Sequence, residues 1–128
     1  MQFFKKKRTI YREKNRALLH RWNLFECRFF SIKIHKLMSS DSACDHDHPW
    51  AFITFLLKGG YVEYTPTGSK VYSRFSLLYR PAKYVHRLEI HQPVWTFVIT
   101  FKKVRQWGFI TPRGWIPFYE YKGGDRCE

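Results

Sequence analysis

The sequence predicts an all-β domain, folded as a sandwich or a barrel of short strands. Aromatic residues make up 20% of the chain, and such large flat side chains pack well on a pleated sheet. Apolar and polar residues alternate in several stretches, and glycine- or proline-containing turns separate these stretches at regular spacing. With 128 residues, 45% of them hydrophobic, the chain is long enough to form one domain with a buried core.

The first 23 residues are expected to form a basic arm or a short helix. Thr9 offers a helix cap for residues 9–20, although the apolar face of this helix is poor. Residues 1–36 hold 11 basic and 2 acidic side chains, a net charge of +9 out of +13 for the whole chain. Such a segment suits an anionic partner, which we expect to be a nucleotide, a nucleic acid or an acidic protein surface. The alternative is a solvated arm that only keeps the protein soluble.

Residues 24–122 have the pattern of successive strands. Phe30, Ile32 and Ile34 alternate with polar residues between positions 26 and 37, which indicates a half-buried strand. The stretch 46–57 becomes almost wholly apolar, which indicates a central strand. Further strands are expected at 61–65, 71–79, 84–90, 94–102, 107–110 and 118–121, with loops or turns at 38–45, 58–60, 66–69 and 111–117. Residues 123–128 are expected to form a tail.

The lack of a visible targeting signal and the pattern of cysteines point to an intracellular protein. The first residues lack the apolar region of a signal peptide, and no apolar stretch approaches the roughly 18 residues that span a bilayer. The three cysteines, Cys27, Cys44 and Cys127, form no CxxC pair. Such a sparse, odd set is typical of a reducing compartment, so we expect a cytoplasmic protein, or one in the host cytoplasm if it is viral.

Three histidines lie in two short stretches about forty residues apart, and they predict a metal site. His46 and His48 are one residue apart, so in a strand both rings point to the same face. His86 ends the second stretch, and from a paired strand its ring can complete the site. Imidazole suits Zn, Cu, Fe and Ni. Cys44 has the same parity and is either a fourth ligand or a small loop residue. Asp45 and Asp47 point away from the site and are expected to be solvated carboxylates, the alternative being that they accept hydrogen bonds that orient the ligands.

The order and spacing of these residues resemble the cupin superfamily of small double-stranded β-helix, or jelly-roll, barrels. The first cupin motif is a His-x-His pair, an acidic residue about four positions later and a glycine about seven further on, matched here by His46, His48 and Gly59. The second motif is Pro-x-Gly-x-x-His, matched by Pro81 and His86. The resemblance covers about residues 24–122 and implies a cupin barrel with a mononuclear metal site. Many cupins are dimers, so it also allows a homodimer.

The chain departs from the cupin pattern at three positions. Phe52 replaces the usual acidic ligand, Lys83 replaces the glycine of the second motif, and Ile90 replaces its asparagine. What remains is a set of three neutral ligands, as in thiol-dioxygenase-like cupins and in some zinc sites. The expected metal is therefore Fe(II) or Zn. The alternative is a barrel that has lost its metal and uses the histidines for hydrogen bonding or acid–base chemistry.

The chain is also similar to a group of short bacterial and phage proteins to which no substrate is assigned. The shared stretches are His-Asp-His-Pro-Trp at 46–50, Gly-Gly-Tyr at 59–61, Arg-Pro-Ala at 80–82, Trp-Thr-Phe-Val-Ile-Thr at 95–100, Trp-Gly-Phe at 107–109 and Gly-Trp-Ile-Pro at 114–117. This resemblance supports the fold and the three ligands.

Six further residues are candidates to line a ligand pocket. Aromatic side chains could surround a barrel mouth, and arginine holds carboxylate or phosphate in a bidentate manner. These candidates are Trp50, Tyr61, Arg80, Tyr84, Trp95 and Arg105. Core packing is the alternative for the aromatic residues.

Two classes of function stay open. One is a metal-dependent enzyme, of the Fe(II) oxygenase type, acting on a small polar or anionic molecule. The other is a non-catalytic barrel that binds a nucleotide or nucleic acid, or docks onto a larger assembly such as a phage particle. No catalytic acid or base can be assigned from the sequence.

Overall fold

Antiparallel β-strands make up most of the computed structural model, which describes residues 2–3, 7–13, 16–40 and 44–120. The strands are β1 (Gln2–Phe3), β2 (Lys7–Glu13), β3 (Arg16–Glu26), β4 (Phe30–Leu37), β5 (Phe52–Lys58), β6 (Tyr61–Thr65), β7 (Gly68–Tyr72), β8 (Leu77–Arg80), β9 (Arg87–Glu89), β10 (Val94–Phe101), β11 (Gly108–Thr111) and β12 (Gly114–Pro117). A single 3₁₀ turn, η1 (Phe118–Glu120), follows.

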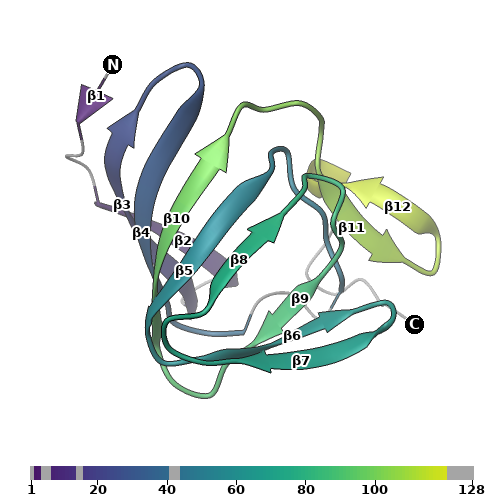
Figure 1. Cartoon of the computed structure of the whole chain (residues 1–128). Helices are drawn as coiled ribbons and strands as arrows, with labels where there is room; N and C mark the ends of the chain where they lie inside the picture. The colour runs from purple at the N-terminus through teal and green to yellow at the C-terminus, as the bar shows by residue number, and fades with distance from the viewer. Residues whose placement is uncertain (1, 4–6, 14–15, 41–43, 121–128) are drawn as a thin grey trace.

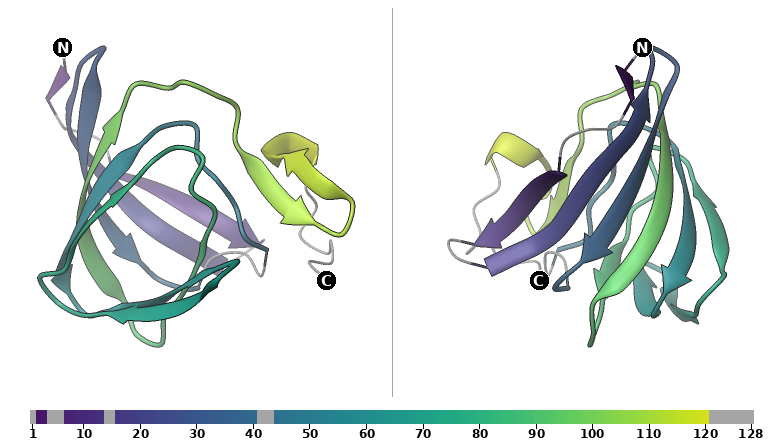
Figure 2. Two further views of the ribbon diagram at one scale, coloured as in Figure 1. Left: turned by 45° about the vertical axis from the view of Figure 1, so that its right-hand side comes forward. Right: turned by 90° about the vertical axis from the view of Figure 1, so that its left-hand side faces the viewer.

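These strands form one large sheet, one small sheet and a hairpin (Figure 1). The large sheet has the order β1-β3-β4-β10-β5-β8, with β2 paired to β3, and the small sheet has the order β7-β6-β9. The two sheets curve toward each other as a barrel, and the β11–β12 hairpin stands at its side (Figure 2, left). This architecture agrees with the predicted jelly-roll barrel.

The apolar core joins the two sheets. Leu56 of β5 and Val94 of β10 come from the large sheet, and Tyr61 of β6 comes from the small one. Leu78 and Ile90 complete this cluster. Because buried positions alternate along β5 and β10, one face of the large sheet points into the barrel and the other points outward.

Gly59 makes the turn between the two sheets possible. Its backbone has φ +82°, and a Cβ atom there would lie 3.2 Å from the carbonyl oxygen of Pro93. A side chain at this position would therefore be both strained and crowded. This explains why the glycine of the first motif stands between β5 and β6.

The expected N-terminal helix is wrong. Residues 7–13 and 16–26 form the antiparallel strands β2 and β3, and β3 continues the large sheet through its pairing with β4. The poor apolar face of the expected helix is consistent with this result, because a strand that pairs with a sheet does not need apolar residues at helical spacing. β3 runs across position 24, where its pairing with β4 shifts register between Asn23 and Phe25, and the division into an arm and a barrel stays a prediction. Lys5, Lys6 and Lys14 of the basic run, and the tail at 123–128, lie outside the described residues.

Other strand boundaries differ from the expectation where local backbone geometry intervenes. The expected strand 71–79 is divided into β7 and β8, with Phe75 at φ 73° in the turn between them. The expected loop 111–117 contains β12, which pairs with β11 as a hairpin, and the expected strand 118–121 begins as the 3₁₀ turn. The stretch 46–57 becomes a regular strand only at Phe52, because Pro49 has no backbone N–H to donate to a ladder.

Candidate metal centre

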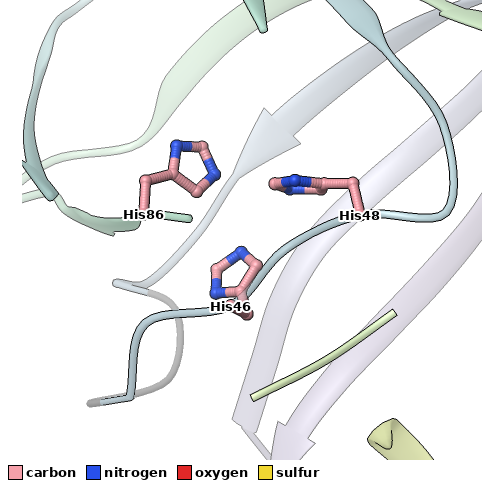
Figure 3. A group of neighbouring side chains, drawn as sticks. All are labelled: His46, His48 and His86. Atoms are coloured by element: carbon pink, nitrogen blue, oxygen red, sulfur yellow. The ribbon is translucent and has the colours of Figure 1, made fainter. Parts of the chain in front are cut away.

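The three predicted histidines meet inside the barrel. One ligating atom from each of His46, His48 and His86 lies within 4.8 Å of those of the other two. Their ring centroids are 4.9 to 5.1 Å apart, and the rings point toward a common centre (Figure 3). Three imidazoles in this arrangement can hold one metal ion.

Backbone hydrogen bonds fix the segment that carries His46 and His48. His46 exchanges two backbone hydrogen bonds with His86, at 2.9 and 3.0 Å, and the N–H of His48 donates to Ala82 at 3.0 Å. On the opposite side, the N–H of Asp47 donates to Gly108. The segment is thus extended and paired on both sides although it is not a long strand, which explains why the i, i+2 argument holds for the two histidines.

The interior around the histidines favours neutral imidazoles. Burial lowers the pKa of His46 from 6.5 to about 3, and the neighbouring His86 adds to this effect. Burial, followed by the charges of His46 and His86, also lowers the pKa of His48 well below 6.5. The neutral imidazole is the form that binds a metal ion.

Phe52 occupies the position of the usual cupin acid and faces the site, as its parity predicts. Only 9% of Phe52 is exposed, and its ring lies 4.6 Å from that of His48 and 6.1 Å from that of His86, centroid to centroid. The ring adds apolar surface where an acidic ligand would add charge. A metal ion at this site would therefore keep its full charge.

A buried carboxylate, Glu63 of β6, positions His86. Its Oε2 lies 2.6 Å from His86 Nδ1, and it also accepts hydrogen bonds from the Arg80 guanidinium and, at 3.2 Å, from the Tyr84 hydroxyl. Burial alone would raise the pKa of Glu63, but the hydrogen bonds from His86 and Arg80 outweigh it and lower the pKa from 4.5 to about 2. An ionised Glu63 orients His86 so that Nε2 faces the centre.

Sequence reasoning assigned no role to Glu63, although a signal was present. Glu63 shares its parity with Tyr61, so both side chains of β6 point into the barrel. A carboxylate at an inward position of a barrel needs a partner, and a ligand histidine commonly donates its second N–H to such a group.

Asp47 forms a second buried network, which attaches the β11–β12 hairpin to the metal-site segment. Its carboxylate accepts hydrogen bonds from the Gly108 N–H at 2.7 Å and the Trp115 Nε1–H at 2.9 Å, and it pairs with Arg105. Only 3% of Asp47 is exposed, so the expected solvated carboxylate is wrong. Its parity, opposite to that of the histidines, is what directs it toward the hairpin.

The six predicted pocket residues are found in different environments. Arg80 pairs with Glu63 and Arg105 with Asp47, so both guanidinium groups already have a carboxylate partner. Tyr84 lies beside His86, with ring centroids 5.8 Å apart, and Trp50 lies near the interior against Lys33. Tyr61 belongs to the core, and Trp95 is stacked on Trp22 on the outer face of the sheet. Roles of these residues in binding a ligand stay predictions.

Cys44 is disulfide-bonded and fully buried, so it has no thiolate to offer a metal. It belongs to a small core cluster with Phe109 and Ile116. The use of the cysteines as a sign of a reducing compartment therefore loses its basis. None of the helices in the described ranges has the length and apolar character needed to cross a bilayer.

The residues present fit a metal ion. The buried Nδ1 atom of His48 has no hydrogen-bond partner in the described part of the chain. Burying an imidazole nitrogen without a partner is costly, and coordination to a metal would offset this cost. The donor set of three imidazoles suits iron, zinc, copper or nickel.

Comparison with known proteins supports the fold. No protein-family model matches the sequence, and neither does any curated protein. Among solved structures, a cupin superfamily protein from Desulfitobacterium hafniense is 15% identical over 73% of this chain and 84% of its own, with a TM-score of 0.58. The DMSP lyase DddQ from Ruegeria pomeroyi is 12% identical over 91% of this chain and 63% of its own, with a TM-score of 0.63. The Fe(II) form of HppE is 6% identical over 75% of this chain and 57% of its own, with a TM-score of 0.59. These similarities show that the chain has the fold of the cupin superfamily.

Proposed function

We propose that the protein is a mononuclear metal enzyme in which His46, His48 and His86 hold one divalent ion, Fe(II) or Zn. The observation that carries this proposal is the set of three ligating atoms within 4.8 Å, from two segments that pair with each other. A structural zinc site is usually closed by four protein ligands, and here the fourth cupin position holds Phe52. An open site with three neutral ligands suits catalysis better than structural support.

The chain's own residues would prepare the site for a small polar or anionic substrate. Bound iron would supply redox chemistry with dioxygen, and bound zinc would supply Lewis-acid chemistry. Glu63 fixes the orientation of His86, and the Phe52 ring packs against the His48 ring. The Fe(II) form of HppE has the same fold, which makes an iron-dependent reaction compatible with this architecture.

The first test is the metal content of the protein. Protein purified anaerobically without an affinity tag should contain about one equivalent of metal by elemental mass spectrometry. The double variant His46→Ala/His86→Ala should lose it, whereas His91→Ala should retain it because the His91 side chain is 80% exposed and lies outside the group. A folded wild type that takes up no Fe(II) or Zn after soaking would refute the proposal. If metal is found, its identity directs the activity assays: iron would direct them toward oxygen consumption, and zinc toward hydrolysis or elimination.

The high positive charge favours a second candidate function, binding of a nucleotide or nucleic acid. The net charge of +9 within residues 1–36 supports it. Affinity for a short oligonucleotide should then fall steeply with salt and survive metal removal. Affinity that is lost with EDTA or does not change with salt would exclude this candidate.

A further inference from the structure

Lys33 of β4 is a cation inside the barrel. Only 7% of this residue is exposed. In the strand register it lies opposite Val98 of β10, which in turn lies opposite Thr54 of β5, and both of these are buried residues of the inward face. Residues directly opposite each other in a sheet project to the same side. The ammonium group of Lys33 therefore belongs to the same interior as the histidines.

Among the described residues, the partners of Lys33 are a hydroxyl and an aromatic ring rather than a carboxylate. Its Nζ donates a hydrogen bond to Thr100 Oγ1 at 3.1 Å and lies 4.6 Å from the centre of the Trp50 ring. Within residues 16–40 and 44–120, no carboxylate lies within ion-pair distance of it. Arg80 and Arg105, by contrast, each have a buried carboxylate. A buried charge without a counter-ion is expensive, and such a group is a candidate for binding a ligand.

Two contacts connect Lys33 to the histidines. Thr100, the acceptor of Lys33, lies opposite Phe52 in the sheet, and the Phe52 ring contacts that of His48. Trp50, the aromatic partner of Lys33, stands two residues after His48 in the chain. Phe52 and Trp50 thus link Lys33 and Thr100 to the neighbourhood of His48 on the inner face of the sheet.

The neighbouring inward-facing pair on β3 and β4 adds positive charge near Lys33. Arg21 of β3 lies opposite His35 of β4, and Arg21 Nε donates a hydrogen bond to His35 Nε2 at 3.0 Å. Burial, followed by the charge of Arg21, lowers the pKa of Lys33 from 10.5 to about 8, so Lys33 is still mostly protonated near neutral pH. The charge of Glu26 raises the pKa of Lys33, but this effect is smaller than the lowering by burial and Arg21.

We propose that Lys33 and Thr100 form a carboxylate-binding subsite that holds the substrate of the metal centre. This inference rests on the proposed function and names its substrate class as a small carboxylate. The donors match such a group. Lys33 has three N–H bonds, of which Thr100 accepts one, and the Thr100 hydroxyl, while accepting from Lys33, can donate its own proton. Two donors that start from one hydrogen-bonded pair can serve the two oxygens of one carboxylate.

The test uses propionate as the probe and metal-free protein, so that direct binding to a metal cannot contribute. Lys33→Met removes the interior charge and keeps the length of the side chain. Lys36→Met is the matched control, because Lys36 lies on the outer face of the same strand, over Trp95 at 5.3 Å. Calorimetry should show that Lys33→Met weakens propionate binding about tenfold to a hundredfold, as expected for loss of a charged hydrogen bond. Lys36→Met should stay within about twofold of wild type, and uncharged propionamide should not compete.

Equal propionate affinity of wild type and Lys33→Met would overturn the subsite, and so would equal losses in the two variants. Thermal unfolding of each variant checks that it is folded, and Thr100→Val gives an independent second variant. Metal content separates this inference from the proposed function. A wild type with one equivalent of metal and no Lys33-dependent binding refutes only the subsite, whereas Lys33-dependent binding in a protein that takes up no metal refutes only the metal enzyme.

Discussion

Replacing Glu63 by Gln should weaken metal binding strongly, because this carboxylate is the hydrogen-bond partner of His86. The substitution keeps the shape of the side chain but removes the negative charge that His86 Nδ1 meets at 2.6 Å. Loss of such a partner of a ligand histidine typically lowers metal affinity about 10- to 100-fold. Competition with a chromophoric chelator would measure this ratio for Zn and Co.

Arg80→Gln separates this effect from a general loss of stability. Arg80 donates to the same carboxylate at 2.6 and 3.1 Å, and its side chain is 13% exposed. Either substitution breaks the buried ion pair, which costs about 3 to 5 kcal/mol of unfolding free energy. Only Glu63→Gln removes the carboxylate from His86. Both variants should therefore unfold at lower temperature, but only Glu63→Gln should lose metal affinity. Equal affinities for the two variants would contradict the assigned role of Glu63.

Three further predictions concern charge and backbone geometry. Asp47→Asn should destabilise the protein by about 2 to 3 kcal/mol, because the carboxylate that holds Gly108, Trp115 and Arg105 loses its charge. Amide hydrogen exchange in residues 108–117 should rise, and unchanged exchange there would argue against attachment of the hairpin by Asp47. Lys33→Met should stabilise the protein at pH 7 by up to about 3 kcal/mol, since burial lowers the pKa of Lys33 from 10.5 to about 8. The Lys33 ammonium group loses its proton at a lower pH in the folded chain than in the unfolded chain, so wild type should gain stability between pH 8 and 10.5. Chemical denaturation should therefore show that the stability advantage of Lys33→Met disappears over this range. An advantage that does not change with pH would contradict a buried, charged Lys33. Gly59→Ala should cost about 1 to 2 kcal/mol, because φ is +82° and the new Cβ meets Pro93, and a wild-type melting temperature would refute the argument.

The parts of the fold that the sequence predicts are those with a strong local period. Alternation along β4, β5 and β10 indicates strands, and the i, i+2 spacing places His46, His48 and Phe52 on one side. The N-terminal strands were missed because a cap residue and scattered apolar positions can be satisfied by a helix or by a strand. Pairing of β3 with β4 decides between the two, and pairing with a distant segment cannot be read from local residues.

The partners of the candidate site could not be predicted because they depend on contacts between segments far apart in the chain. Glu63 and His86 are 23 residues apart, and Asp47 and Arg105 are 58 apart. Arg80 and Arg105 looked like residues that bind a ligand because arginine commonly binds anions, but the anions that they contact are the protein's own carboxylates. Lys33 looked like an ordinary polar residue of a half-buried strand, and only the register with β10 shows that it points inward.

The balance of charge in the interior connects these observations to the proposed substrate class. Glu63 is matched by Arg80, and Asp47 is matched by Arg105, so neither carboxylate is available to offset another positive charge. The three histidines are neutral ligands, and Phe52 stands where an acidic ligand would reduce the charge of a bound ion. A divalent ion at the histidines would therefore add two positive charges to an interior that already contains Lys33, for which the described residues supply no carboxylate. In a region of low dielectric constant such an excess favours an anion over a neutral molecule of the same size. A substrate with a carboxylate near its reacting group would supply the favoured negative charge and, in the same molecule, the group that reacts at the proposed metal centre.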